Sequence, residues 1–145
     1  MTWFADLSPC TYFEENECAS GLIAVGWLDR DHDFRRGATS EEFFAKLTEL
    51  LEHPWQPFFF LGFHSCEICE LERPPRGKSN LFVPASGFLY VAPELISHYV
   101  SAHRYAPPPE FQEAVLSCPR MRSTEYLEAL RANAPKELIE QSALR

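Results

Sequence analysis

The chain is organised around the segment Gly62-Phe63-His64-Ser65-Cys66-Glu67-Ile68-Cys69 and a later one, His98-Tyr99-Val100-Ser101-Ala102-His103. The first segment carries a Cys-x2-Cys pair and the second a His-x4-His pair, separated by residues 70–97. Thiolate sulfur and neutral imidazole nitrogen are ligands that suit Zn²⁺, and short spacing within each pair is typical of tetrahedral structural sites. We therefore predict that Cys66, Cys69, His98 and His103 bind Zn²⁺.

Two other interpretations of these residues remain open from the sequence. A Cys-x2-Cys pair that opens a helix after a strand is typical of thioredoxin-like dithiols. Residues 70–75 would make a poor helix because Pro74 and Pro75 interrupt it. The four side chains could also be ordinary core or surface residues, since free cysteine is frequently just buried.

The spacing of the histidines sets a geometric condition on a shared metal ion. In an ideal helix, residues five positions apart point about 140° away from each other. His98 and His103 can therefore share one ion only if the helix tightens or ends between them. The prolines at 107–109 predict that the helix ends near Arg104.

His64 precedes Cys66 by two positions, so in an extended segment the two side chains face the same side. His64 is then a group that supports a ligand, a substitute ligand, or an exposed histidine without a role at the metal. We favour the first and the third of these over direct ligation.

A second polar group of residues is Asp29-Arg30-Asp31-His32-Asp33, which follows a predicted strand over residues 22–28. Three carboxylates and an imidazole at the end of a strand could hold a metal ion or supply acid–base chemistry. The commoner interpretation is a charged loop whose aspartates cap turns.

The pattern of apolar residues predicts an α+β fold: a small mixed sheet of short strands, a zinc-knuckle, hairpin and helix unit, and C-terminal helices. Thr39 is the predicted N-cap of the first helix, and Pro93 the predicted first residue of the helix that carries the histidines. The other predicted strands are residues 58–63, 80–84 and 87–91, with Ala85-Ser86 as a tight turn. Later helices are predicted at 109–116, 123–132 and 136–144.

The length of 145 residues suits one zinc-binding domain spanning 1–145. Residues 1–21 are expected to form an N-terminal arm that packs on the body, and residues 136–145 a tail that frays.

Composition restricts the function classes. The formal charge of −8 and the pI of about 5.1 argue against a nucleic-acid partner, because phosphate binding needs a basic stripe and the only basic cluster is residues 73–78. No apolar run is long enough to cross a bilayer, and the N-terminus does not resemble a signal peptide. Five cysteines, an odd number, fit a reducing compartment, so we expect a cytoplasmic protein.

Three motifs carry a resemblance to a known family: Gly26-Trp27-Leu28-Asp29, the Phe63-His64-x-Cys66-x2-Cys69 segment, and the His98-Tyr99-x3-His103-x-Tyr105-x-Pro107-Pro108 segment. Together they resemble an uncharacterised family of small bacterial proteins with a domain of unknown function, over residues 3–118. The resemblance implies that the cysteine and histidine segments belong to one pattern in a small bacterial protein with a metal site. It implies no reaction.

Two functions remain in competition. The first is a non-enzymatic, zinc-finger-like module that binds another protein, because four protein ligands leave the metal no open position. Its acidic charge would favour a basic partner, such as a toxin that it restrains. The second is a zinc-dependent hydrolase with three ligands, a bound water, and a carboxylate such as Glu67 or Asp31 as base.

Overall fold

The computed structural model describes residues 2–11, 21–57 and 63–142 and has the predicted α+β architecture. A mixed three-stranded sheet has the order β1-β5-β4: β1 (Leu22–Ala24) runs parallel to β5 (Leu89–Pro93), and β4 (Asn80–Pro84) runs antiparallel to it. Val91 lies opposite Ala24 on one side and Phe82 on the other. A separate antiparallel pair joins β2 (His64–Ser65) to β3 (Arg76–Gly77).

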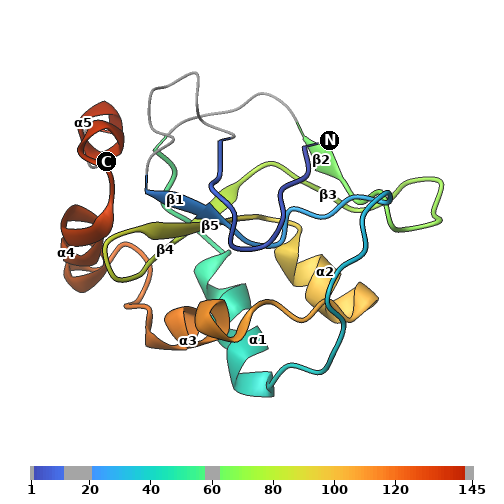
Figure 1. The fold of residues 1–145 in the computed structure, drawn as a ribbon. Coiled ribbons are helices and arrows are strands. Elements are labelled where there is room, and N and C mark those ends of the chain that lie inside the picture. The colour runs from blue at the N-terminus through green and yellow to red at the C-terminus, as the bar shows by residue number, and fades with distance from the viewer. Residues whose placement is uncertain (1, 12–20, 58–62, 143–145) are drawn as a thin grey trace.

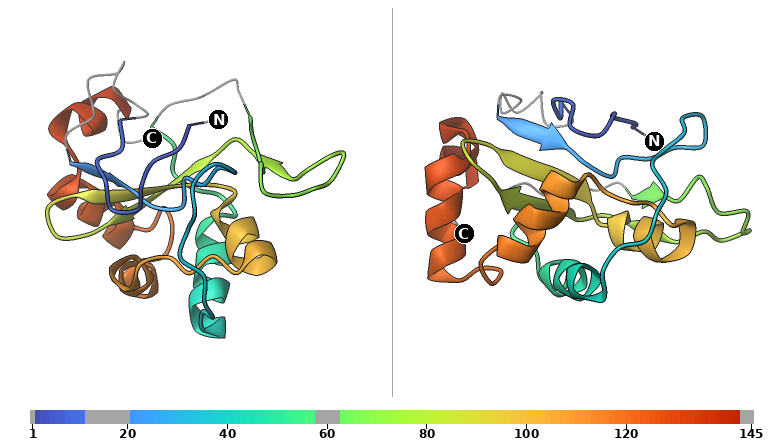
Figure 2. Two further views of the ribbon diagram at one scale, coloured as in Figure 1. Left: turned by 45° about the vertical axis from the view of Figure 1, so that its right-hand side comes forward. Right: turned by 60° about the horizontal axis from the view of Figure 1, so that its bottom comes forward.

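Five helices follow or separate these strands within the described residues: α1 (Glu41–Leu50), α2 (Ile96–His103), α3 (Pro109–Ser117), α4 (Thr124–Asn133) and α5 (Lys136–Ser142). Helices α1, α2 and α3 lie on one face of the three-stranded sheet, and the N-terminal segment lies on the other (Figure 1). Helices α4 and α5 lie at one end of the molecule, while the β2–β3 pair lies at the opposite end (Figure 1, Figure 2). None of the described helices is long and apolar enough to cross a membrane.

The hydrophobic core lies between the sheet and its helices. Helix α1 directs Phe43, Leu47 and Leu50 inward, one helical turn apart, and all three are fully buried. Phe111 of α3 packs edge-on against both Phe43 and Tyr90. Buried polar groups are tied to strand carbonyls: Trp27 Nε1 donates to Val91 O at 2.9 Å, and Tyr126 Oη donates to Phe82 O.

The predicted start of α1 was one residue too early. The N-cap is Ser40, not Thr39, because Ser40 is the residue directly before the helix and its Oγ accepts from the Phe43 N–H at 3.1 Å. The first four N–H groups of a helix have no partner within the helix. The Ser40 side chain supplies an acceptor for one of them.

The prediction that Pro93 begins a helix was wrong. Pro93 is the last residue of β5, where it lies opposite Asn80, and α2 begins only at Ile96. The preceding hairpin is looser than predicted: residues 85–88 connect β4 to β5, and the Ala85 N–H donates to Phe88 O at 3.0 Å.

The first strand is shorter than the apolar run that predicted it. It ends at Ala24, and Gly26 then adopts a left-handed conformation with φ +81° that a strand cannot continue through. The Gly26 N–H donates to Asp6 Oδ1 at 3.0 Å. Of the strand predicted over residues 58–63, positions 58–62 lie outside the described residues, and Phe63 belongs to no strand.

Residues 2–11 of the N-terminal segment pack along β1. The Leu7 and Cys10 N–H groups donate to the carbonyls of Ala24 and Leu22, each at 2.8 Å. The Phe4 ring packs edge-on against Trp27 with ring centres 5.4 Å apart.

Candidate metal centre

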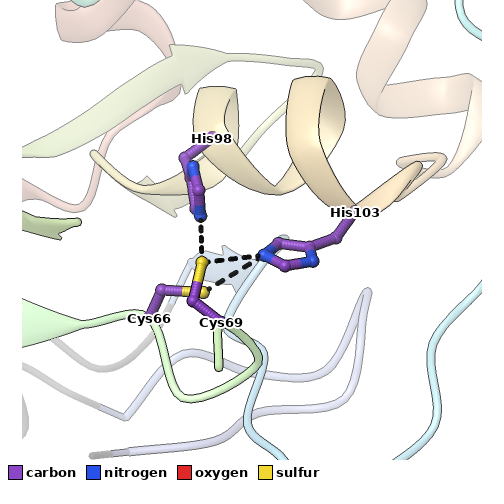
Figure 3. Close-up of side chains that lie close together, drawn as sticks. All are labelled: Cys66, Cys69, His98 and His103. Carbon is purple, nitrogen blue, oxygen red and sulfur yellow. Dashed lines mark hydrogen bonds between the residues drawn. The ribbon is translucent and has the colours of Figure 1, made fainter. Parts of the chain in front are cut away.

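The structure brings together all four residues that the sequence predicts as metal ligands. One ligand atom from each of Cys66, Cys69, His98 and His103 can be chosen so that all four lie within 4.8 Å of one another. The cysteines come from the loop between β2 and β3, and both histidines come from α2 (Figure 3). Figure 3 shows the two imidazoles directed from the helix toward the two sulfur atoms.

The distances between these atoms suit a tetrahedral ion. Cys69 Sγ lies 3.2 Å from His98 Nε2 and 3.3 Å from His103 Nε2, and Cys66 Sγ lies 3.4 Å from His103 Nε2. Usual Zn–S and Zn–N bond lengths at tetrahedral angles would separate sulfur from nitrogen by about 3.5 Å. The four residues therefore already have nearly the spacing of a Cys2His2 metal site, and they could hold a metal ion.

A tight hairpin presents the cysteines. The Cys66 N–H donates to Pro75 O at 2.9 Å, directly after the Ser65–Arg76 pair of the β2–β3 ladder. This bond closes the loop of residues 66–75, which contains both thiols. We call residues 63–77 the cysteine hairpin.

Gly77 explains how close this hairpin comes to the segment before α2. A Cβ at Gly77 would lie 2.9 Å from Glu94 Cβ, closer than side chains approach one another. Glu94 in turn accepts from the Ser79 N–H at 3.3 Å through Oε1. The absence of a side chain at Gly77 therefore lets the hairpin pack beside the start of the histidine helix.

The end of α2 brings the two histidines together, but not by the tightening or the earlier helix end that the spacing predicted. The helix ends at His103, and Arg104 follows in a left-handed conformation with φ 57° and ψ 28°. Its N–H donates to Tyr99 O, five residues back, and the Tyr105 N–H donates to the same carbonyl at 3.1 Å. The last turn is thus widened rather than tightened, which reduces the angle between positions five apart. The two imidazole centres lie 5.0 Å apart with their planes at 83°.

Without a cation this cluster favours uncharged side chains. Burial raises the pKa of the Cys69 thiol, and the hydrogen bond and charge of Cys66 raise it further. Burial lowers the pKa of His98, and the charge of His103 adds to that effect. A divalent cation at the centre would reverse the balance for the thiols, because a metal ion stabilises the thiolate form.

His64 lies outside the group of four. Its half-buried ring packs edge-on against Trp27, with centres 5.6 Å apart and planes at 87°. Burial lowers its pKa. Whether His64 supports a ligand or substitutes for one stays a prediction.

The Asp29 to Asp33 segment forms a capped turn. Asp29 Oδ1 accepts from the N–H groups of Asp31 and His32 at 3.1 and 3.0 Å and lies 2.9 Å from His32 Nδ1. Burial opposes ionisation of Asp29, but these contacts with His32 outweigh it and hold the pKa below its usual value. The His32 ring stacks on Trp3, with centres 3.7 Å apart. The turn-capping interpretation of this segment therefore holds.

This turn nevertheless faces the cysteine hairpin across a cavity of about 640 Å³. Residues 29–34 and Arg36 line one side, and residues 67–70 line the other. Cys69 thus belongs to both the Cys/His cluster and the wall of this cavity. Sequence reasoning missed the cavity because its two walls are distant in the chain.

Tyr99 is a residue of the site that sequence reasoning also missed. Its side chain is fully buried, and its hydroxyl has no hydrogen-bond partner among the described residues. Burial raises its pKa, and the negative charges of Cys66, Glu67, Cys69 and Asp29 raise it further. The signal in the sequence was its place beside His98.

The other described cysteines lie away from the cluster. Cys118 is buried behind α3, and burial raises its pKa to about 11. Cys10 is buried beside β1.

Comparison with known proteins gives a family and no activity. No curated protein and no solved structure matches this chain significantly. Residues 2–116, most of the chain, match the family model "Domain of unknown function (DUF7919)". This confirms the predicted relation to an uncharacterised family over nearly the same residues. The chain is a member of the DUF7919 family.

Proposed function

We propose that the protein binds one Zn²⁺ through Cys66, Cys69, His98 and His103, and that this ion is structural. The observation that supports the proposal most directly is that three sulfur–nitrogen distances among these four side chains are 3.2 to 3.4 Å and that all four ligand atoms lie within 4.8 Å of one another. Two thiolates and two imidazoles in tetrahedral spacing favour zinc over harder ions such as Mg²⁺ or Ca²⁺, which prefer oxygen. Four protein ligands close the coordination shell, which is typical of structural sites.

The structural role follows from how little else holds the hairpin. Strands β2 and β3 have two residues each, and an isolated two-stranded ribbon is marginal in water. The proposed ion would bond the hairpin loop directly to α2, so its binding free energy would become folding free energy.

We further propose that the metal-bound end is a surface for another protein. The cysteine hairpin carries two large apolar side chains that are exposed to solvent. They are Phe63, which is 56% exposed, and Leu71, which is 62% exposed. Exposed apolar groups on a rigid element suit a protein contact. The formal charge of −8 over the whole chain favours a basic partner, which would have to avoid Arg76 and Lys78 beside Phe63.

A zinc-dependent hydrolase is the second candidate, because the cavity beside Cys69 is lined by carboxylates that include Glu67 and Asp31. That function needs one of the four ligands to leave and a water to take its place, with a carboxylate as base.

One experiment separates the two candidates. Protein purified under reducing conditions without chelator is analysed for metal, then treated with a zinc chelator and followed by circular dichroism. We expect about one zinc per chain, as for a single tetrahedral site, and loss of structure on chelation. Protein that contains no zinc would contradict the metal proposal. A fold unchanged by chelation would contradict the structural role and favour the hydrolase.

A further inference from the structure

A second cavity lies at the end of the molecule away from the Cys/His cluster. It has a volume of about 550 Å³ and is enclosed by the β4–β5 connection, α3 and α4, which lie together at one end in Figure 1. None of the described residues that line it belongs to the cysteine hairpin or to α2. This cavity is therefore separate from the proposed metal site.

Much of the cavity wall is apolar. The Phe88 ring meets the Tyr90 ring edge-on, with centres 5.0 Å apart, and the small side chains of Ala114 and Ala129 also line the cavity. Cys118 completes this part of the wall. Burial raises the pKa of the Cys118 thiol to about 11, so the thiol is uncharged at neutral pH and is a poor nucleophile. These groups suit the apolar body of a ligand that binds without a covalent bond.

The Tyr90 hydroxyl is the observation that indicates a ligand. Tyr90 lies in β5, whose backbone pairs with β1 on one side and β4 on the other, so it is the side chain that reaches the cavity. The residue is only 6% exposed, yet its hydroxyl makes no hydrogen bond with another described residue. Buried polar groups are nearly always paired, so a partner for this hydroxyl has to come from within the cavity.

The charged side chains of the cavity are negative. Glu110 and Glu113 line it from α3, and no lysine, arginine or histidine is among the described residues that line it. Neither carboxylate forms an ion pair with a basic side chain in the described part of the chain. Phe111, next to Glu110, packs edge-on against Tyr90 with ring centres 5.6 Å apart, so the start of α3 lies beside the unpaired hydroxyl. A ligand here should therefore be a hydrogen-bond donor with a positive charge.

We propose that this cavity binds a small organic amine whose ammonium group lies between Glu110 and the Tyr90 hydroxyl and whose apolar body packs against Phe88. The hydroxyl oxygen accepts from the ammonium group, and the carboxylates balance its charge. The volume lies within the range of about 300–1,000 Å³ that is usual for small-molecule pockets. This inference goes beyond the proposed function and does not depend on it.

The test is a titration of the full chain as purified, followed by amide chemical shifts. The probe is 2-phenylethylamine, with 2-phenylethanol as the uncharged control of similar size and shape. We expect millimolar binding of the amine, weakened by salt, with shift changes concentrated in residues 84–90, 110–119 and 129–133. Equal binding of the alcohol, or shift changes elsewhere, would overturn the proposal. Tighter binding of N-acetyl-lysine amide than of the amine would overturn a free ligand in favour of a lysine side chain.

Variants identify the groups that carry the binding. Tyr90→Phe removes only the unpaired hydroxyl, so it should leave the melting temperature unchanged and weaken amine binding by about fivefold. Glu110→Gln with Glu113→Gln should weaken it by about tenfold, since each exposed ion pair contributes up to about fivefold. Glu49→Gln removes an exposed carboxylate of α1 that does not line the cavity, and it should change nothing. Unchanged binding in Tyr90→Phe or in the double variant would overturn the proposal.

Discussion

The two ends of the molecule differ in what can hold them together. At the end formed by β4, β5, α3 and α4, apolar side chains are packed out of contact with water, among them Phe82, Phe111 and Tyr126. In residues 63–79, at the other end, only Cys66 and Gly77 are buried. Hydrophobic burial can therefore account for the first end but not for the second. The contrast indicates that a small region without a core needs another source of stability, and the Cys/His cluster is placed to supply it.

Removal of the proposed metal ion should have the largest effect on the difference in stability between the two ends. We expect a chelator to expose the Cys66 amide, which donates to Pro75 O, to hydrogen exchange, because structural zinc typically supplies about 10–16 kcal/mol of apparent binding free energy. The Val25 amide, which donates to Val91 O in the sheet, should keep more of its protection.

Exchange measured by NMR before and after chelation checks this. Loss of protection at both amides together would show that the two ends form one cooperative unit. Retained protection at Cys66 would show that no metal holds the hairpin.

Single cysteine substitutions test which thiols stabilise the fold through the proposed metal ion. Cys66→Ser and Cys69→Ser should each lower the free energy of unfolding by about 3 kcal/mol or more, since each removes a proposed zinc ligand. Cys10→Ser and Cys118→Ser change buried thiols outside the cluster and should cost about 1 kcal/mol.

Thermal unfolding and zinc content of the four variants are the measurements. Leu47→Ala is a useful companion, because it should cost about 2–5 kcal/mol through the cavity it leaves in α1 while zinc content stays unchanged. Similar small losses of stability at all four cysteines would contradict the assignment of Cys66 and Cys69.

The four clustered residues could be predicted from the sequence because each pair is local. Cys66 and Cys69 are three positions apart in one loop, and the prolines after Arg104 indicated the helix end near His103. How the helix ends could not be predicted in detail: the last turn widens around the Tyr99 carbonyl instead of tightening.

Non-local pairing explains most of what the sequence did not predict. The parallel pairing of β1 with β5 joins residues far apart in the chain, and the cavity likewise has one wall from residues 29–36 and the other from residues 67–70. Pro93 was misassigned because a proline suits the first turn of a helix and the last position of a strand equally well. Thr39 and Ser40 are both good N-caps, so the sequence alone could not choose between them.

Histidine substitutions test which imidazoles are ligands of the proposed metal ion. His98→Ala and His103→Ala should weaken zinc retention strongly, because water would have to replace a ligand. His64→Ala should leave one zinc per chain, with affinity reduced at most about tenfold to a hundredfold if His64 supports a ligand.

Cobalt substitution and visible spectroscopy report the geometry and the sulfur ligands directly. A tetrahedral two-sulfur spectrum in His64→Ala supports the closed site. If His103→Ala bound cobalt normally and His64→Ala bound none, the fourth ligand would be His64 and not His103.

The smallest effect is expected at Asp6, which connects the segment after β1 to the segment after α2. Its carboxylate accepts from the Gly26 N–H, beyond β1, and from Tyr105 Oη at 2.8 Å, two residues after His103. Burial nevertheless raises the pKa of Asp6, and the hydrogen bonds from Gly26 and Tyr105 only partly offset that effect.

The sign of the resulting pH dependence follows from this raised value. Below the ordinary pKa of 3.8, Asp6 is protonated in both folded and unfolded chains and has no effect on stability. As the pH rises above 3.8, the unfolded chain ionises first, so folding loses stability until the pH passes the folded pKa. Asp6→Asn lacks this titration. Its free energy of unfolding should therefore exceed that of the wild type by up to about 1 kcal/mol at neutral pH and by less near pH 3. Urea unfolding of both proteins across that range, with Glu125→Gln as the matched exposed control, measures it. If Asp6→Asn were instead least stable at neutral pH and recovered on acidification, the hydrogen bonds from Gly26 and Tyr105 would outweigh burial, and ionised Asp6 would stabilise the fold.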